Sequence, residues 1–148
     1  MDISFNKLTR RDLDEIMSIE ADSQPDAWNR KAFWKILKNP MTRAATIQVD
    51  GETLGFTICV AEGLSCRLLN IAIATAWRRK GLGTAALQDV EAFARKKALV
   101  EICFEVRESN LAAQMLYKKL GYEAIDIMRG YYGDDDGYRM RKPIYIDT

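Results

Sequence analysis

Apolar and polar positions along the chain follow two spacings, one typical of helices and one typical of strands. Apolar residues recur every three or four positions in four segments, residues 10–21, 30–37, 84–97 and 111–120. Seven apolar or alternating runs predict strands at residues 3–8, 42–49, 53–61, 65–74, 100–106, 122–128 and 139–146. The order of these elements predicts an α/β fold, in which a hairpin-rich first half leads into two strand-helix units.

Local signals mark the ends of several elements. Thr9 and Asp12 have the spacing of a capping box, and Asn29 is placed to cap the second helix. Asp50 and Gly51 predict a hairpin turn. The run at residues 65–74 is rich in Leu and Ile without regular alternation, which predicts a strand buried on both faces.

Length and charge narrow the class of protein. The chain of 148 residues is expected to form one domain spanning residues 1–148. The net charge of +1 argues against a bulk electrostatic grip on nucleic acid, although Arg78, Arg79 and Lys80 form a local cationic cluster. The chain starts without signal-peptide features and has no apolar run of membrane-spanning length, so we expect a cytoplasmic protein that does not bind membranes.

The supply of reactive side chains is limited. Histidine is absent, which removes mechanisms that use imidazole as a base or a ligand. Cys59, Cys66 and Cys103 form no CxxC pair, so we expect buried thiols and no metal site. Catalysis must therefore use carboxylate, tyrosine, lysine, thiol or backbone groups.

The segment AWRRKGLGTAAL, residues 76–87, combines cations with two glycines ahead of a helix, which predicts an anion site. Its GLGTAA portion formally satisfies the dinucleotide-binding pattern G-x-G-x-x-A. That pattern normally starts at the end of a strand, whereas six residues separate Gly81 from the predicted strand end here. A nucleotide P-loop is excluded because no GK[ST] follows, and a plain glycine-containing connection is the simplest alternative.

The longer segment LLNIAIATAWRRKGLGTAAL resembles the GNAT superfamily of acyl-CoA-dependent N-acetyltransferases, in which a strand, R/Q-x-x-G-x-G/A and a helix follow one another. The resemblance implies a GNAT-like single α/β domain, with a central mixed sheet of about seven strands and roughly four helices on both faces. It implies acetyl-CoA as cosubstrate, its pyrophosphate held by backbone amides and a helix N-terminus. Gly81 and Gly83 are expected to be glycine because a side chain would meet the phosphate or forbid the backbone dihedrals. The implied cofactor-binding residues are Ile71, Ala72, Ile73, Arg78, Arg79, Lys80, Gly81, Leu82, Gly83, Thr84, Asn110 and Tyr117.

A second cluster, residues 104–125 followed by MRGYYG, is similar to the RimI branch of the same superfamily, which acetylates protein N-termini. The likeness implies a protein or peptide N-terminus as acceptor, with a ribosomal protein as one candidate. It implies that Glu105 is the general base and Tyr117 the general acid near the departing sulfur. A carboxylate at the end of a strand and a phenol on the next helix can face one cleft. The alternatives are an exposed strand residue for Glu105 and a packed core tyrosine for Tyr117.

Energetics favour an α-amine over a lysine as acceptor. An α-amine with a pKa near 8 needs about 1 to 1.4 kcal/mol to become neutral at pH 7, whereas lysine needs roughly 4.6 kcal/mol. The resemblance places Trp28, Glu105, Tyr131 and Tyr132 at the acceptor, with ordinary loop packing as the alternative for the aromatic residues. Asp134, Asp135 and Asp136 are interpreted as solvated loop residues.

Three other functions remain open at this level. The chain could be a CoA-binding regulatory module without catalysis, in which Glu105 and Tyr117 are structural. It could acetylate lysine or small-molecule amines, or it could bind a dinucleotide. We expect a monomer or weak dimer.

Overall fold

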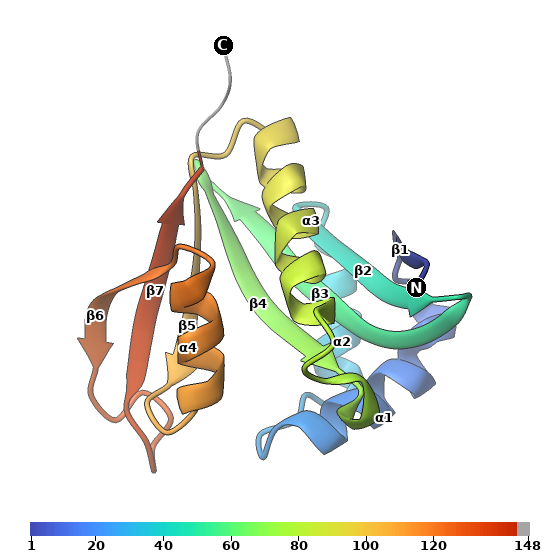
Figure 1. Ribbon diagram of the computed structural model, residues 1–148, viewed down its shortest axis with the longest axis horizontal. Coiled ribbons are helices and arrows are strands. Elements are labelled where there is room, and N and C mark those ends of the chain that lie inside the picture. The colour runs from blue at the N-terminus through green and yellow to red at the C-terminus, as the bar shows by residue number, and fades with distance from the viewer. Residues whose placement is uncertain (145–148) are drawn as a thin grey trace. The chain divides into compact units, whose positions relative to one another are not determined.

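A computed structural model describes residues 1–144 (Figure 1). Its elements follow the predicted order, with bounds β1 (Ile3–Lys7), η1 (Arg10–Asp12), α1 (Leu13–Ser23), α2 (Arg30–Leu37), β2 (Thr42–Val49), β3 (Glu52–Glu62), β4 (Ser65–Ile73), η2 (Thr75–Trp77), α3 (Leu82–Lys96), β5 (Glu101–Arg107), α4 (Leu111–Lys119), β6 (Glu123–Met128) and β7 (Gly137–Pro143). The seven strands have the order β1-β2-β3-β4-β5-β7-β6. β4 and β5 are parallel, whereas β1–β2, β2–β3, β5–β7 and β6–β7 are antiparallel. The prediction of a mixed sheet of about seven strands with four α-helices is confirmed.

The chain divides into two compact units, which we describe separately. The first comprises Met1–Ala61 and Leu68–Val90, and the second comprises Glu62–Arg67 and Glu91–Thr148. The division falls within both β4 and α3, so each of these elements contributes to both units.

The first unit has its core between α1, α2 and the strands β3 and β4. Its buried cluster is made of the apolar residues Leu8, Leu13, Ile16, Phe33, Phe56, Ile58 and Ala72. A second cluster joins Leu82, at the start of α3, to Val49 and Leu54. The helices form because their apolar residues lie on one face, and Asn29 caps α2 by accepting a hydrogen bond from the Ala32 N–H at 2.8 Å.

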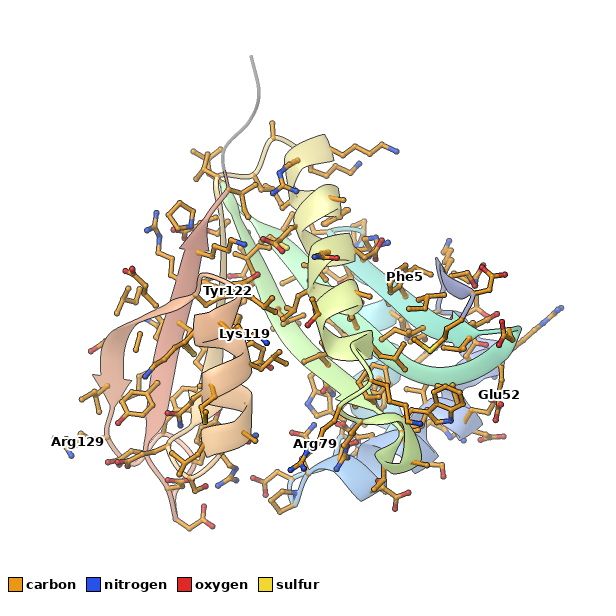
Figure 2. All side chains as sticks on the ribbon, in the orientation of Figure 1. Phe5, Glu52, Arg79, Lys119, Tyr122 and Arg129 are labelled. Atoms are coloured by element: carbon orange, nitrogen blue, oxygen red, sulfur yellow. The ribbon has the colours of Figure 1, made fainter. Side chains whose placement is uncertain are left out.

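The second unit packs α4 against β5 and its neighbours, as the warm-coloured part of Figure 1 shows. Ile102, Phe104 and Val106 are buried on the helix side of β5. Tyr122, which Figure 2 labels beyond the end of α4, is also buried and packs on Phe104 with ring centroids 5.1 Å apart.

Four sequence expectations need correction at the level of elements. α3 begins at Leu82, not at residue 84, because Gly81 supplies the positive φ that turns the chain into the helix. The helix expected at residues 10–21 starts with a 3-10 turn, although the Asp12 carboxylate does accept the Thr9 N–H, as the capping box requires. β7 starts at Gly137, and residues 145–146 of the predicted last strand lie outside the described part.

The fourth correction concerns burial. β4 alternates between buried and half-buried residues, so it is not buried equally on both faces as its composition suggested. β3 is the strand with a continuous buried run, from Leu54 to Val60.

Candidate active site

The loop between η2 and α3 has the backbone geometry of an anion site. Arg79 and Gly81 both have positive φ, 62° and 84°. Figure 2 labels Arg79 in this loop. The Ala85 N–H donates to the Gly81 carbonyl at 3.1 Å, and the amides of residues 82–84, at the start of α3, have no acceptor within the helix. Left-handed residues beside a helix N-terminus form a cationic hollow of main-chain N–H groups, and a pyrophosphate fits that chemistry.

Two side chains of this loop make contacts within the protein. Leu82 is 1% exposed and packs with Val49 and Leu54, so only its backbone can face a ligand. The Lys80 ammonium lies 5.4 Å from the centroid of the Trp77 ring. The argument that glycine is needed for its backbone dihedrals applies to only one of the two positions. Gly81 requires its positive φ, whereas Gly83 lies inside α3, where any residue adopts the dihedrals.

Arg78 points back toward the protein. Its Nε donates to the Ile73 carbonyl at 3.2 Å, and its Nη2 lies 3.2 Å from Ser23 Oγ and 3.4 Å from the Asp22 carbonyl. These bonds join the start of the loop to the end of β4 and to the C-terminus of α1. The guanidinium is therefore engaged with protein acceptors, and its expected role in CoA binding stays a prediction.

The end of β4 holds the predicted pantetheine-binding backbone. Ala72 is buried, and Ile71 and Ile73 are half-buried. Gly55 of β3 lies so close that a Cβ there would be 2.6 Å from the Ala72 carbonyl oxygen. A bare backbone at position 55 is what permits this close approach.

In the second unit, the Glu105 carboxylate lies between two guanidinium groups. Its side chain is 11% exposed, and its Oε1 is 3.2 Å from Arg67 Nη2 and 3.4 Å from Arg139 Nη2. Oε2 has no partner among the described residues, so this oxygen is open to accept a proton. Arg67 and Arg139 are functional candidates that the sequence did not indicate, because β4, β5 and β7 are adjacent only in the folded sheet.

Tyr117 lies in an aromatic cluster on the helix side of β5. Its ring centroid is 4.4 Å from that of Phe104 and 6.2 Å from that of Tyr122. Burial, and to a lesser extent Tyr132, raises the pKa of Tyr117 to about 12, so the phenol is protonated at neutral pH. Packing and a proton-donor role are both compatible with this position.

Glu105 and Tyr117 do not share one face of β5. Successive residues of a strand point to opposite faces, and Tyr117 packs on Phe104 while Glu105 pairs with Arg139 across the other face. The expectation that both groups face one cleft stays a prediction. The two groups are presented to opposite sides of the same strand.

The loop at residues 130–137 is ordered by its acids. Asp134 pairs with Arg107 at 3.0 Å, and the Asp136 carboxylate accepts the Gly130 N–H at 2.7 Å. The Ser109 hydroxyl donates to Asp135, and this hydrogen bond lowers the pKa of that carboxyl. The three acids organise the loop, so their interpretation as merely solvated residues was wrong.

The aromatic residues of that loop differ in burial. Tyr131 is 44% exposed, whereas Tyr132 is half-buried, with the Arg107 guanidinium 4.4 Å from its ring centroid. The two rings meet edge to face, 4.9 Å between centroids. Tyr131 is therefore the more accessible candidate for acceptor contact.

Two remaining candidates have clear structural partners. Trp28, in the first unit, packs its ring on Phe33 with centroids 5.2 Å apart. Asn110 caps α4, since its side-chain oxygen accepts the Ala113 N–H at 3.2 Å. The packing alternative describes the Trp28 ring well, and neither contact prevents a further role in binding.

No group of three or more Cys, Asp or Glu side chains among residues 1–144 is arranged to hold a metal ion. Over the same residues, no helix combines the length and apolar character that a membrane crossing requires.

Known proteins similar to this chain share both sequence and fold. Residues 13–122 match the model of the Acetyltransferase (GNAT) family. The [ribosomal protein bS18]-alanine N-acetyltransferase of Escherichia coli is 31% identical over 136 residues, covering 90% of each chain. The crystal structure of the Escherichia coli ribosomal-protein-S18-alanine N-acetyltransferase superposes with a TM-score of 0.90 at 28% identity, over 99% of this chain and 97% of that one.

A second relative and a second solved structure are also similar to this chain. The N-alpha-acetyltransferase of Sulfurisphaera tokodaii is 33% identical over 147 residues, covering 90% of this chain and 88% of its own. A Bacillus subtilis acetyltransferase solved in complex with CoA has a TM-score of 0.81 at 17% identity, over 97% and 98% of the two chains, which shows the shared fold alone. The matched family model spans most of this chain and its relatives align along nearly their whole length, so the chain belongs to the Acetyltransferase (GNAT) family.

Proposed function

We propose that this acetyltransferase moves an acetyl group from acetyl-CoA to the α-amino group of a protein N-terminus, in the cytoplasm. Acetyl-CoA as the donor is supported by one observation, the hollow of main-chain amides formed by Arg79, Gly81 and the first turn of α3. The acceptor half rests on the relatives, whose names specify N-terminal alanine and N-alpha acetylation. A ribosomal protein is one candidate acceptor.

Direct transfer is the chemistry that suits these residues. The Glu105 carboxylate would take a proton from the ammonium group of the acceptor, and the neutral amine would then attack the thioester carbon. As the new carbon–nitrogen bond forms and the carbon–sulfur bond breaks, the Tyr117 phenol would donate a proton to the departing sulfur. Cys103, on the same strand face as Glu105, is a poor nucleophile because burial and then the charges of Glu101 and Glu105 raise the pKa of its thiol.

CoA would be held mainly by backbone. The amides at residues 79–84 would bind the pyrophosphate, and the β4 backbone at residues 71–73 would bind the pantetheine arm. When bound, acetyl-CoA supplies an activated thioester, and the chain supplies positioning and proton transfer. The cationic side chains of Arg79 and Lys80 add favourable charge at the rim of this site.

A peptide panel tests the proposal. Peptides with a free α-amine and a small first residue are incubated with acetyl-CoA beside N-blocked peptides that contain lysine, and products are mapped by mass spectrometry. We expect acetylation at the α-amine only. Equal or greater product on lysine would contradict N-terminal acetylation, and the absence of any product from either set would contradict the proposed reaction.

A further inference from the structure

A buried carboxylate in the first unit is not used by the proposed chemistry. Glu20 of α1 is fully buried, and its Oε1 accepts a hydrogen bond from Gln24 Nε2 at 2.6 Å. Its Oε2 accepts from Asn70 Nδ2 at 2.8 Å and from the Trp28 N–H at 3.0 Å. Three donors thus compensate a group that would be very costly to bury alone.

This network connects three different pieces of chain. Gln24 and Trp28 belong to the segment 24–29 that joins α1 to α2, while Asn70 lies in β4 immediately before residues 71–73. Gln24 Nε2 also lies 3.2 Å from Asn70 Oδ1, which closes the network. Apolar residues of similar size would stabilise such a core equally well, whereas a satisfied polar network selects one backbone conformation.

A second set of bonds holds the same segment from its N-terminal side. Arg78, the first residue of the phosphate loop, donates to Ser23 Oγ and the Asp22 carbonyl at the end of α1, and to the Ile73 carbonyl. The strand therefore bonds to segment 24–29 directly through Asn70, and the loop proposed to bind acetyl-CoA bonds to Asp22 and Ser23, immediately before the segment. Fixing that loop limits the motion of Arg78, and hence of the end of α1.

We propose that Glu20 and Arg78 are positioning residues, which hold segment 24–29 in the conformation that receives the acceptor chain and link that conformation to acetyl-CoA binding. The inference rests on the proposed function, and it names the acceptor-positioning element of the same enzyme. Trp28 is the part of this element that the sequence had placed at the acceptor. Donor binding at the phosphate loop orders the segment, so acetyl-CoA raises the affinity for the acceptor peptide.

Steady-state kinetics of Glu20→Gln test whether Glu20 positions segment 24–29 for the acceptor. The glutamine presents an amide N–H₂ to donors that require an acceptor, so segment 24–29 loosens. We expect the KM for an acceptor peptide to rise by about ten-fold, the loss typical of a hydrogen bond to a charged group, with the KM for acetyl-CoA and kcat changed less than two-fold.

Glu91→Gln is the matched control for that variant. Glu91 is also buried, and its carboxylate pairs with Lys142 in the second unit at 2.5 Å. We expect this variant to lose stability without a change in the acceptor KM. An unchanged acceptor KM in Glu20→Gln, or the same increase in both variants, would refute the positioning role. Asn70→Ala removes one donor from the same carboxylate, and serves as the milder variant if Glu20→Gln does not fold.

Hydrogen exchange tests the link between CoA binding and the conformation of segment 24–29, and it does not depend on enzyme turnover. In the wild-type protein, we expect CoA to slow exchange of the amides at residues 24–28, and in Arg78→Gln we expect this protection to be at least five-fold smaller. The inference is wrong if CoA leaves these amides unchanged in the wild type or protects them equally in the variant. Absence of N-terminal product would instead defeat the proposed function, while normal product with an unchanged acceptor KM in Glu20→Gln would defeat this inference alone.

Discussion

At the scale of single residues, Glu105 is a carboxylate with one oxygen engaged and one oxygen open. Arg67 and Arg139 both contact Oε1, which fixes the orientation of the side chain on β5. Oε2 makes no such contact among the described residues. A general base needs this combination of a fixed position and an available lone pair.

Glu105→Gln removes the proposed general base and keeps a side chain of nearly the same size and shape. We expect kcat to fall about 10² to 10³-fold, the usual contribution of a positioned base, with the CoA dissociation constant unchanged. Turnover and CoA titration measure the two quantities. Glu101→Gln, on the same strand face and paired with Arg141 and Ser65, should retain turnover within about two-fold. Full activity in Glu105→Gln would remove this residue from the mechanism.

Tyr117 combines a packing role with a reactive hydroxyl. Tyr117→Phe keeps the ring contact with Phe104 and removes the proton donor, so we expect kcat to fall at least ten-fold while the melting temperature changes little. Because burial raises the pKa of Tyr117 to about 12, the phenol should stay protonated up to about pH 10. A wild-type pH profile whose kcat falls well below pH 10 through ionisation of this tyrosine, detected by its absence in Tyr117→Phe, would contradict the assignment.

The same shift has a consequence for stability at high pH. The pKa in the folded state is above the value of 10.0 expected for an unfolded tyrosine, so only the unfolded chain loses this proton as the pH rises from about 10 to 12. The free energy of unfolding therefore decreases across that window. Urea titrations should show a smaller decrease in Tyr117→Phe than in the wild type, and identical decreases would argue against the shift.

At the scale of elements, the register of β3 against β4 depends on one glycine. Strands can approach so closely at Gly55 only because no Cβ is present, since a Cβ would lie 2.6 Å from the Ala72 carbonyl oxygen and 3.0 Å from Ile73 Cδ1. The phosphate loop shows a related dependence, because Gly81 at φ 84° sets the start of α3. The proposed donor site therefore depends on two backbone positions on different elements.

Gly55→Ala tests the first of these positions. We expect a loss of about 1 to 3 kcal/mol in the free energy of unfolding, because the added methyl group must displace a backbone carbonyl. Displacement of residues 71–73 should also weaken CoA binding. Thr53→Ala in the same strand is the control, and equal losses in the two variants in urea unfolding would show that the close approach does not matter.

Sequence signals and observed elements agree where the determinants are local. Asn29 lies immediately before the helix that it caps, so spacing alone identified it. Burial of β4 was misjudged because it depends on what covers each face of the sheet. Strand composition does not contain that information.

At the scale of the whole molecule, ligand binding and stability are linked. A ligand that binds only the folded chain stabilises it by about 2.7 kcal/mol at a concentration 100 times its Kd. For a chain of this length that corresponds to about 5 to 10 °C in melting temperature. The proposed phosphate hollow predicts such a shift with CoA.

Thermal unfolding with CoA and with NAD discriminates between the two ligands that the glycine pattern allows. We expect CoA to raise the melting temperature by about 5 to 10 °C at 100 times its Kd, and NAD to leave it unchanged. Gly83→Val should reduce the CoA shift, because a branched side chain in the first turn of α3 crowds the amides. A shift with NAD and none with CoA would identify a dinucleotide site instead.

The amino-acid sequence by itself determined the order of elements and the phosphate-loop motif, because periodicity and motif spacing are properties of neighbouring residues. The choice of Glu105 and Tyr117 came from the resemblance of residues 104–125 to a known family. Only the tertiary structure decided which groups meet. Arg67 and Arg139 reach Glu105 through strand pairing, and Asn70 reaches Glu20 across fifty positions of sequence. It also placed Glu105 and Tyr117 on opposite faces of β5 and bonded the Arg78 guanidinium to the Ile73 carbonyl and to Ser23. Such contacts depend on sheet register and helix packing, which arise from burial shared by the fold and leave no mark in any local stretch of chain.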